Sequence, residues 1–338
     1  MMKSIKTTAY IVIVLVLPVM LIPYILKSQT RDTAHLTSHE LRVIVANNEA
    51  YGKDHKSGYS GIAELYNTND SQGNLFVPNY AGLNFEHIFS GDSGTYQWDM
   101  YETRKAPMEV VKHSGTKTEL RQSRTKNWPL KSSIIYEVKN NGIDFTFSGI
   151  PLEDAWKKYG YIGLFFASYI NEPKEKGIHF IGQSVAGKGD MKPRWIYHLP
   201  EIHGVQANHR PAGSNWKPSL DTSGFPISLV LGISDLTYNY PFYYGLSGEN
   251  VFIMMFENPG KDAEIRFAQS PDGGGDKNPA WDFILYQKKY KVGRKFTFRG
   301  RAVYKKFEGE DDIIKTYEQW SGKTVSRPQD NSSANSKK

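Results

Sequence analysis

His198, His203 and His209 lie within one twelve-residue segment of this 338-residue chain, which has nine histidines in all. Imidazole titrates near neutral pH, so histidines that lie together can serve as general acid and general base. We therefore predict His203 and His209 as catalytic residues in a proton transfer. The alternative is a polar loop whose histidines make ordinary hydrogen bonds.

The residues around these histidines favour a site for a polar ligand. The segment Trp195–Leu199 has the composition of a strand, and Pro200 must end it because proline cannot serve a central ladder. The loop that follows emerges at a sheet end, where binding residues are usually mounted. The predicted substrate-binding residues of this segment are Arg194, Trp195, His198, Asn208 and Arg210.

No metal site and no cofactor are predicted. The chain has no cysteine, and the spacing His-x4-His-x5-His matches no zinc signature and no helix face. An open zinc site made by the three histidines stays an alternative, which would imply metal-dependent hydrolysis. The glycine-rich segment 270–282 lacks the G-x-x-x-x-G-K-[ST] pattern of a phosphate-binding loop.

Trp281 and Asp282 end that glycine-rich segment, and their side chains suit a sugar. A flat indole can pack against the apolar face of a sugar ring, while a carboxylate binds the ring hydroxyls. We predict both as substrate-binding residues. A buried Trp281 that begins a core strand is the alternative.

Glu86 is a further candidate for acid–base catalysis, and His87 follows it directly. Neighbouring residues of a regular strand point to opposite faces of the sheet. We therefore expect only one of the two side chains to face a site.

The first 28 residues predict a membrane anchor. Lys3 and Lys6 precede an uncharged apolar run from Ala9 to Leu26, about long enough to cross a ~30 Å hydrocarbon layer. The basic residues favour a cytoplasmic N-terminus, so the main domain would be periplasmic or extracellular. A cleaved signal peptide is the alternative, although no small-x-small pattern follows the run.

The rest of the chain predicts an all-β fold. Asn141-Gly142 lies between the alternating segments Ile134–Val138 and Ile143–Ser148 and predicts a hairpin tip. Apolar residues of Glu310–Trp320 recur with the period of a helix. About fifteen candidate strands exceed an immunoglobulin sandwich and suit a large two-sheet antiparallel β-sandwich with a short C-terminal helix.

The chain is thus predicted to have four parts: a transmembrane signal anchor (1–28), a linker (29–40), a β-sandwich domain (41–322) and a disordered tail (323–338). Among the predicted strands are Leu41–Ala46, Ile227–Ile233 and Trp281–Tyr286. The formal net charge of +7 is spread along the chain rather than gathered in a stripe, so no nucleic-acid partner is predicted.

The segments NLFVPNYAGLNFEHIF and RFAQSPDGGGDKNPAWDF, together with the strand-end histidines, resemble the galactose-mutarotase-like β-supersandwich. Aldose epimerases and domains of glycoside hydrolases and polysaccharide lyases share that fold. The resemblance, which covers about residues 41–305, implies a carbohydrate-binding or carbohydrate-modifying protein. Mutarotases transfer protons with His and Glu side chains, but no residue of this chain can be matched to those positions.

An exported, membrane-anchored carbohydrate protein is therefore the expected function, with epimerisation or lyase-type elimination as the expected chemistry. Arg194 or Arg210 would hold an anionic group such as a uronate, which makes an acidic polysaccharide a candidate partner. The alternative is a non-catalytic envelope protein that uses the same face for binding or assembly.

Overall fold

The computed structural model describes residues 33–69, 71–92, 99–186, 192–221 and 223–328. The predicted anchor, residues 1–28, lies outside these ranges. In the described part of the chain, no helix has the length and apolar character needed to span a membrane.

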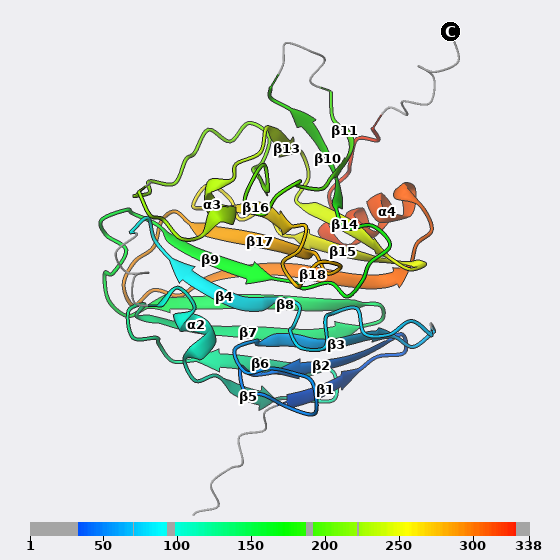
Figure 1. Cartoon of the computed structure of the whole chain (residues 1–338), viewed down its shortest axis with the longest axis horizontal. Coiled ribbons are helices and arrows are strands. Elements are labelled where there is room, and N and C mark those ends of the chain that lie inside the picture. Colours follow the sequence, from blue (N-terminus) through cyan, green and yellow to red (C-terminus); the bar gives the residue numbers. More distant parts are fainter. Residues whose placement is uncertain (1–32, 70, 93–98, 187–191, 222, 329–338) are drawn as a thin grey trace, which may run out of the picture. The chain divides into compact units, whose positions relative to one another are not determined.

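The described residues form eighteen strands and three helices (Figure 1). The strands are β1 (Thr33–Thr37), β2 (Leu41–Ala46), β3 (Gly61–Asn67), β4 (Asn84–Phe89), β5 (Glu109–Lys112), β6 (Lys117–Gln122), β7 (Leu130–Lys139), β8 (Gly142–Pro151), β9 (Ile162–Ala167), β10 (Ile178–Ser184), β11 (Arg194–His198), β12 (Asn208–His209), β13 (Leu236–Tyr238), β14 (Phe242–Ser247), β15 (Asn250–Phe256), β16 (Ala263–Ser270), β17 (Ala280–Gln287) and β18 (Phe296–Lys306). The helices are α2 (Glu102–Lys105), α3 (Ser228–Leu231) and α4 (Glu310–Ser321).

These strands pair antiparallel in three sheets. The ten-stranded sheet has the order β11-β10-β14-β15-β18-β8-β7-β6-β5, with β13 paired to β10. The five-stranded sheet has the order β12-β16-β17-β9-β4, and the three-stranded sheet the order β1-β2-β3. The all-β, antiparallel character is as predicted, but the prediction of two sheets is wrong. A loop separates β3 from β4, and Gly82 of that loop forms an isolated bridge with Ile62 of β3.

One apolar core contains residues from all three sheets. Phe283 of β17 packs against Phe256 of β15, with ring centroids 4.9 Å apart, and stacks on Phe166 of β9 at 4.8 Å. These contacts place the five-stranded sheet against one face of the ten-stranded sheet. The opposite face of the five-stranded sheet, which we call the outer face, is therefore turned away from this core.

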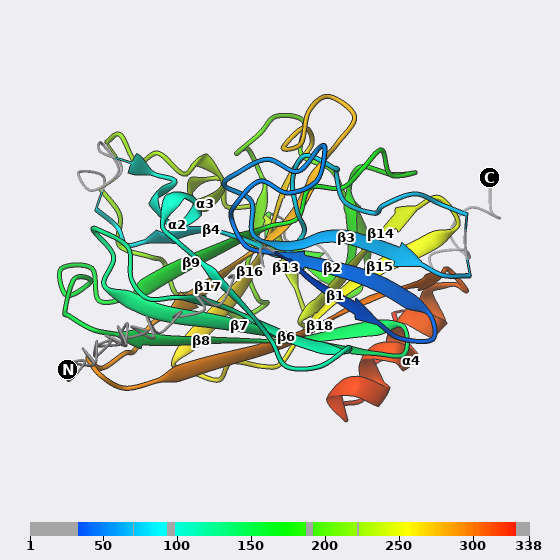
Figure 2. The same ribbon diagram turned by 90° about the horizontal axis from the view of Figure 1, so that it is seen from below.

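Helix α4 covers the other face of the ten-stranded sheet, away from β1–β3 (Figure 2). Phe242 and Tyr244 of β14 belong to the cluster under α4, whereas Tyr243 between them belongs to the main core. This strand therefore buries both faces. The helix lies where the sequence predicts it, with Ile313, Ile314 and Tyr317 buried.

The hairpin of β7 and β8 is confirmed, but its turn differs in detail from the prediction. Lys139 pairs with Gly142, so the turn residues are Asn140 and Asn141. The positive φ of 54° falls on Asn140, not on Gly142. Asparagine tolerates this left-handed conformation better than most residues.

Three local predictions are wrong. Ile227–Ile233 is not a strand, because Ser228–Leu231 forms the short helix α3. The predicted linker 29–40 contains β1, whose Leu36 is fully buried as it pairs beside β2. The predicted disordered tail begins too early, since Val325 is buried and its N–H donates to Glu318.

Candidate functional site

A cavity of about 150 Å³ lies on the outer face of the five-stranded sheet. Strands β4, β9, β16 and β17 form its floor, and segments that include α3 and the residues before α2 form its walls. The polar residues that line it are Glu86, His87, Tyr101, Tyr169, His203, Ser228, Ser270 and Asp282. Three of the predicted site residues, Glu86, His203 and Asp282, are thus brought together.

Glu86 and His87 both line this cavity because β4 is irregular between Phe85 and His87. Phe85 pairs with Phe166 and His87 pairs with Phe165, so Glu86 is an extra residue without a partner in β9. Such a bulge breaks the alternation of the strand. The expectation that only one of the two side chains can face a site is therefore wrong.

Glu86 is 7% exposed and is held by four neighbours. His87 Nε2 lies 3.2 Å from Oε1, Asn84 Nδ2 donates to Oε2 at 3.0 Å, and the Tyr169 hydroxyl also donates to Oε2. Burial alone would raise the pKa of Glu86, but the hydrogen bond from His87 and the charges of His87 and Arg104 outweigh it and lower the pKa. Glu86 is therefore a fixed negative charge in the cavity wall.

His87 is oriented from both ends of its ring. Its Nδ1 lies 2.7 Å from the carbonyl oxygen of Met100, which can only accept, and its Nε2 faces Glu86. The Nδ1–H therefore donates to the Met100 carbonyl, and Nε2 lies beside the Glu86 carboxylate. Arg104 brings a cation to the same carboxylate, with Nη1 3.9 Å from Glu86 Oε2.

Asp282 of β17 has the opposite electrostatic environment. It is 1% exposed, and among the described residues its carboxyl accepts one hydrogen bond, from the Ser168 N–H to Oδ1 at 2.9 Å. Burial raises the pKa of Asp282 well above its usual range, and the negative charge of Glu86 raises it further. One carboxyl of the cavity is thus ionised and the other is biased toward the neutral acid, a pattern typical of acid–base sites.

His203 lies at the exposed rim of the cavity, and its tautomer follows from its partners. Its Nδ1 is 2.8 Å from Ser270 Oγ, and the Ser270 hydroxyl donates its proton to Asp272 Oδ1 at 3.0 Å. The Nδ1–H must therefore donate to Ser270. In neutral His203 the Nε2 carries a lone pair, and within the described ranges it accepts no hydrogen bond. The cavity thus combines a neutral acid with a potential base.

The other two histidines lie on the opposite face of the sheet. Gln269 Nε2 donates to His198 Nδ1 at 2.9 Å and to His209 Nε2 at 3.0 Å. Gln269 precedes Ser270 on β16, so its side chain points to the inner face, and His209 is fully buried. Burial, followed by the charge of His198, lowers the pKa of His209 to about 3. The predicted catalytic role of His209 is therefore wrong: it is a neutral core residue.

The remaining predicted binding residues of that segment also lie outside the cavity. Arg194 is exposed on the edge strand β11, and Trp195 packs beside Tyr244 in the cluster under α4. Asn208 is buried and donates to the Leu229 carbonyl at 3.1 Å, while Arg210 Nη1 donates to the Ser214 carbonyl at 2.9 Å. Neither arginine is placed to hold an anionic group in the cavity.

Trp281 is a core residue. This agrees with the alternative given above, in which a buried Trp281 begins a core strand. It is fully buried, stacks near Phe252 with centroids 6.4 Å apart, and its Nε1–H donates to the Lys176 carbonyl at 2.8 Å. On β17 it points inward, whereas the next residue, Asp282, points into the cavity. The aromatic walls of the cavity are instead Tyr101, Phe165 and Tyr169.

Several cavity residues were not predicted from the sequence. Tyr101 comes from the segment before α2 and Tyr169 follows β9, while Arg104 of α2 reaches Glu86 from outside the lining. No motif marks them, because long-range pairing alone brings them to β4. Ser270 could have been found, since it opens the glycine-rich segment and immediately follows Gln269 on a predicted strand.

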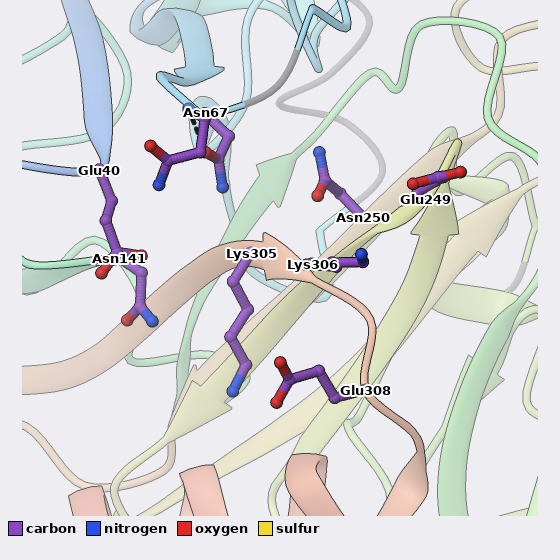
Figure 3. Close-up of a pocket in the computed structure, with 9 residues that line it drawn as sticks. Glu40, Asn67, Asn141, Glu249, Asn250, Lys305, Lys306 and Glu308 are labelled. Carbon is purple, nitrogen blue, oxygen red and sulfur yellow. Dashed lines mark hydrogen bonds between the residues drawn. The ribbon is translucent and has the colours of Figure 1, made fainter.

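A second pocket, of about 370 Å³, lies at the ends of β3, β15 and β18 (Figure 3). Its lining is amide-rich and charged, with Asn67, Asn250, Lys305 and Glu308 around it. None of its nine lining residues is aromatic, and Lys305 is already paired with Asp312 at 2.7 Å. It therefore offers no acid–base pair comparable to that of the first cavity.

Across the described ranges, no group of three or more His, Asp or Glu side chains is placed to hold a metal ion. Of the three histidines of the predicted alternative zinc site, His198 and His209 both contact Gln269 in the interior, whereas His203 contacts Ser270 at the cavity. The structure thus gives no support to that alternative.

No family model matches the sequence, and no curated protein matches it significantly. Among solved structures, the chain is similar to a putative aldose 1-epimerase from Escherichia coli K12, with 11% identity, a TM-score of 0.40, and coverage of 81% of this chain and 99% of that one. A galactose mutarotase-like protein from Lactobacillus casei gives 9% identity, a TM-score of 0.41, and coverage of 81% and 100%.

The chain is also similar to an α-N-acetylgalactosaminidase from Bifidobacterium bifidum, with 10% identity and a TM-score of 0.47. That match covers 85% of this chain but only 38% of the other. The resemblance to galactose-mutarotase-like structures that the sequence predicts is thus found in the comparison of structures.

Proposed function

We propose that the cavity on the outer face of the five-stranded sheet binds a sugar residue and moves protons on it, as an aldose epimerase does. The observation that carries this proposal is the pairing of Asp282 with His203 in one cavity. Burial raises the pKa of Asp282 and favours the neutral acid at this carboxyl. His203 presents an Nε2 lone pair at the rim.

The proposed reaction is ring opening at the anomeric carbon. His203 Nε2 takes the proton of the anomeric hydroxyl while Asp282 gives its proton to the ring oxygen, and the bond between the anomeric carbon and the ring oxygen breaks. The open-chain aldehyde rotates and closes again, which returns both protons. Glu86 stays ionised and positions His87 and Tyr169.

The size of the cavity supports a small ligand. Its volume of about 150 Å³ lies below the ~300–1,000 Å³ of sites for drug-sized molecules. A single sugar ring is the unit that suits it, with tyrosine rings and hydrogen-bonding groups on its walls.

The test is the rate at which the protein interconverts the anomers of glucose and galactose, measured by saturation-transfer NMR. Asp282→Asn and His203→Gln are each expected to lower the rate by about 100-fold or more, because general acid and base groups each contribute on that scale. His35→Gln, at an exposed position of β1, is the matched control. Rates within threefold of wild type in both site variants would refute the mechanism.

Non-catalytic sugar binding is the second candidate, and one observation favours it. Both oxygens of Glu86 are already engaged, by His87 on one side and by Asn84 and Tyr169 on the other. Glu86 is therefore not free to act as the base. A wild-type protein that binds sugars but leaves the anomers to interconvert at the rate in buffer would support this candidate.

Elimination from a uronate is less well supported. It requires a cation for the substrate carboxylate, and Arg104, which lies beside the cavity, faces Glu86 at 3.9 Å. Arg194 and Arg210, which the sequence suggested for this role, do not line the cavity.

We also propose that residues 1–28 anchor the protein in a membrane and that the main domain works outside the cytoplasm. The apolar run Ala9–Leu26 behind Lys3 and Lys6 supports this location. Membrane fractions washed with high salt should retain the full chain and release a chain that begins at residue 29. Retention of the shortened chain would contradict a single anchor.

A further inference from the structure

A third cavity, of about 550 Å³, lies beside the proposed reaction site. Asn48, Ser57, Tyr59, Tyr101, Arg104 and Lys105 are among the residues that line it. Its volume falls within the range of small-molecule sites, unlike that of the reaction cavity. It is thus large enough for a group that the reaction cavity cannot hold.

The two cavities share a wall. Tyr101 lines both of them. Arg104 lines the larger cavity, and its Nη1 lies 3.9 Å from Oε2 of Glu86 in the smaller one. The two cavities are therefore neighbours on either side of Tyr101.

The shared wall is held rigidly. The Arg104 guanidinium lies over the ring of Tyr59 at 3.9 Å and over the ring of Tyr101 at 4.7 Å, and its Nε donates to the Gly58 carbonyl at 2.7 Å. Asn48 Nδ2 donates to the Arg104 carbonyl at 2.8 Å. Such preorganisation reduces the cost of ordering a binding site.

The charges of the larger cavity favour an uncharged ligand. Arg104 faces Glu86, and Lys105 Nζ lies 2.9 Å from Asp99 Oδ2. Both cations are thus matched by carboxylates, and Glu49 also lines the cavity. An anionic group would have to compete with those carboxylates, whereas neutral hydroxyls would not.

The lining also provides hydrogen bonds. Asn48 is 4% exposed, and its Oδ1 accepts no hydrogen bond within the described part of the chain. The Ser57 hydroxyl and the two tyrosines add further polar and aromatic surface.

We propose that the larger cavity is a subsite for a second, neutral sugar residue, so that the ligand is a neutral oligosaccharide whose reacting residue sits in the smaller cavity. This inference rests on the proposed sugar-binding function. It replaces the acidic polysaccharide suggested by the sequence with an uncharged one.

The test uses isothermal titration of the full-length protein with matched pairs of probes: glucose and cellotriose, galactose and β-1,4-galactotriose, mannose and β-1,4-mannotriose, with trigalacturonate as the acidic counterpart. At least one neutral trisaccharide is expected to bind about tenfold or more tightly than its monosaccharide. Equal affinity within every pair, or tighter binding of trigalacturonate than of every neutral trisaccharide, would overturn the subsite.

The second part of the test fills the larger cavity with a tryptophan side chain. Ser57→Trp is expected to lower trisaccharide affinity to that of the monosaccharide and to leave the monosaccharide unaffected. Lys105→Trp fills the same cavity from an exposed position and covers the case in which Ser57→Trp does not fold. Ser114→Trp, at an exposed turn, is the matched control.

The outcomes separate this inference from the function on which it rests. A protein that binds monosaccharides, but whose trisaccharide affinity survives both tryptophan substitutions, retains the sugar site and loses the subsite. A protein that binds no probe of either length refutes the sugar site itself, and the subsite with it.

Discussion

Glu86 and His87 follow one another in the sequence, yet their side chains face the same cavity and contact each other at 3.2 Å. The bulge in β4 makes this possible. It joins a carboxylate and an imidazole in one wall, next to Asp282, whose pKa is shifted in the opposite direction. The electrostatic contrast of the site thus depends on one irregular residue of one strand.

Glu86→Gln is expected to destabilise the fold by about 3 kcal/mol, because it removes the buried carboxylate that binds His87 and faces the partly buried Arg104. Urea unfolding at pH 7 measures the change. Glu137→Gln on the surface of β7 is the matched control and should change the free energy of unfolding by less than about 0.5 kcal/mol. A similar small effect in both variants would mean that the Glu86 network does not stabilise the fold.

Alternation in the sequence predicted much of the fold. Apolar alternation predicted the β7–β8 hairpin, the helical period predicted α4, and short apolar runs predicted the strands β2 and β17. Which strands pair with one another is not recorded in any such local pattern. The sequence therefore could not show that β9 lies between β4 and β17, which is the pairing that brings Glu86 and Asp282 to one face.

Strand register also explains which of the predicted residues line the cavity. Gln269 and Ser270 are consecutive on β16, and they point to opposite faces of the sheet. The first binds His209 in the core, and the second binds His203 at the cavity. Trp281 and Asp282 are divided in the same way on β17. The sequence identified the right segments, but a shift of one residue decides between core and site.

Gly245→Ala is expected to destabilise the protein by about 1–3 kcal/mol, because an added Cβ would lie 2.2 Å from the Trp281 ring. Thermal or urea unfolding checks this close approach of β14 to β17. Gly73→Ala is the matched control, since nothing lies within 4 Å of its added Cβ. If both variants unfold like wild type, Trp281 does not pack against β14 as described.

Asn140→Val is expected to lower the free energy of unfolding by about 1–2 kcal/mol, because a β-branched residue is strained at the φ of 54° found in the β7–β8 turn. Asn140→Gly should be tolerated, since glycine adopts this conformation freely. Comparing the two variants by urea unfolding isolates the backbone effect. A valine variant as stable as the glycine variant would contradict a left-handed turn residue at Asn140.

The pair His198 and His209 should make stability fall as the pH decreases. His209 Nδ1 faces the Leu236 carbonyl at 3.3 Å, and its Nε2 accepts from Gln269, so the folded state holds it neutral. Burial lowers the pKa of His198, and burial together with His198 lowers the pKa of His209 to about 3. In the unfolded chain both would bind protons near pH 6.5.

The unfolded state therefore binds more protons than the folded state between about pH 6.5 and pH 3. The stabilisation that comes from the two neutral histidines is fully present above pH 6.5. It is lost as the pH falls, and the free energy of unfolding decreases by up to about 1.4 kcal/mol per pH unit for His209. Urea unfolding at pH 7, 6 and 5 measures this slope. Burial raises the pKa of Asp282, so this carboxyl contributes with the opposite sign, but its contribution is common to all the variants compared. His209→Gln, which cannot titrate, should reduce the slope, whereas His35→Gln is the matched control for replacing a histidine. An unchanged slope in His209→Gln would show that the buried pair is not its source.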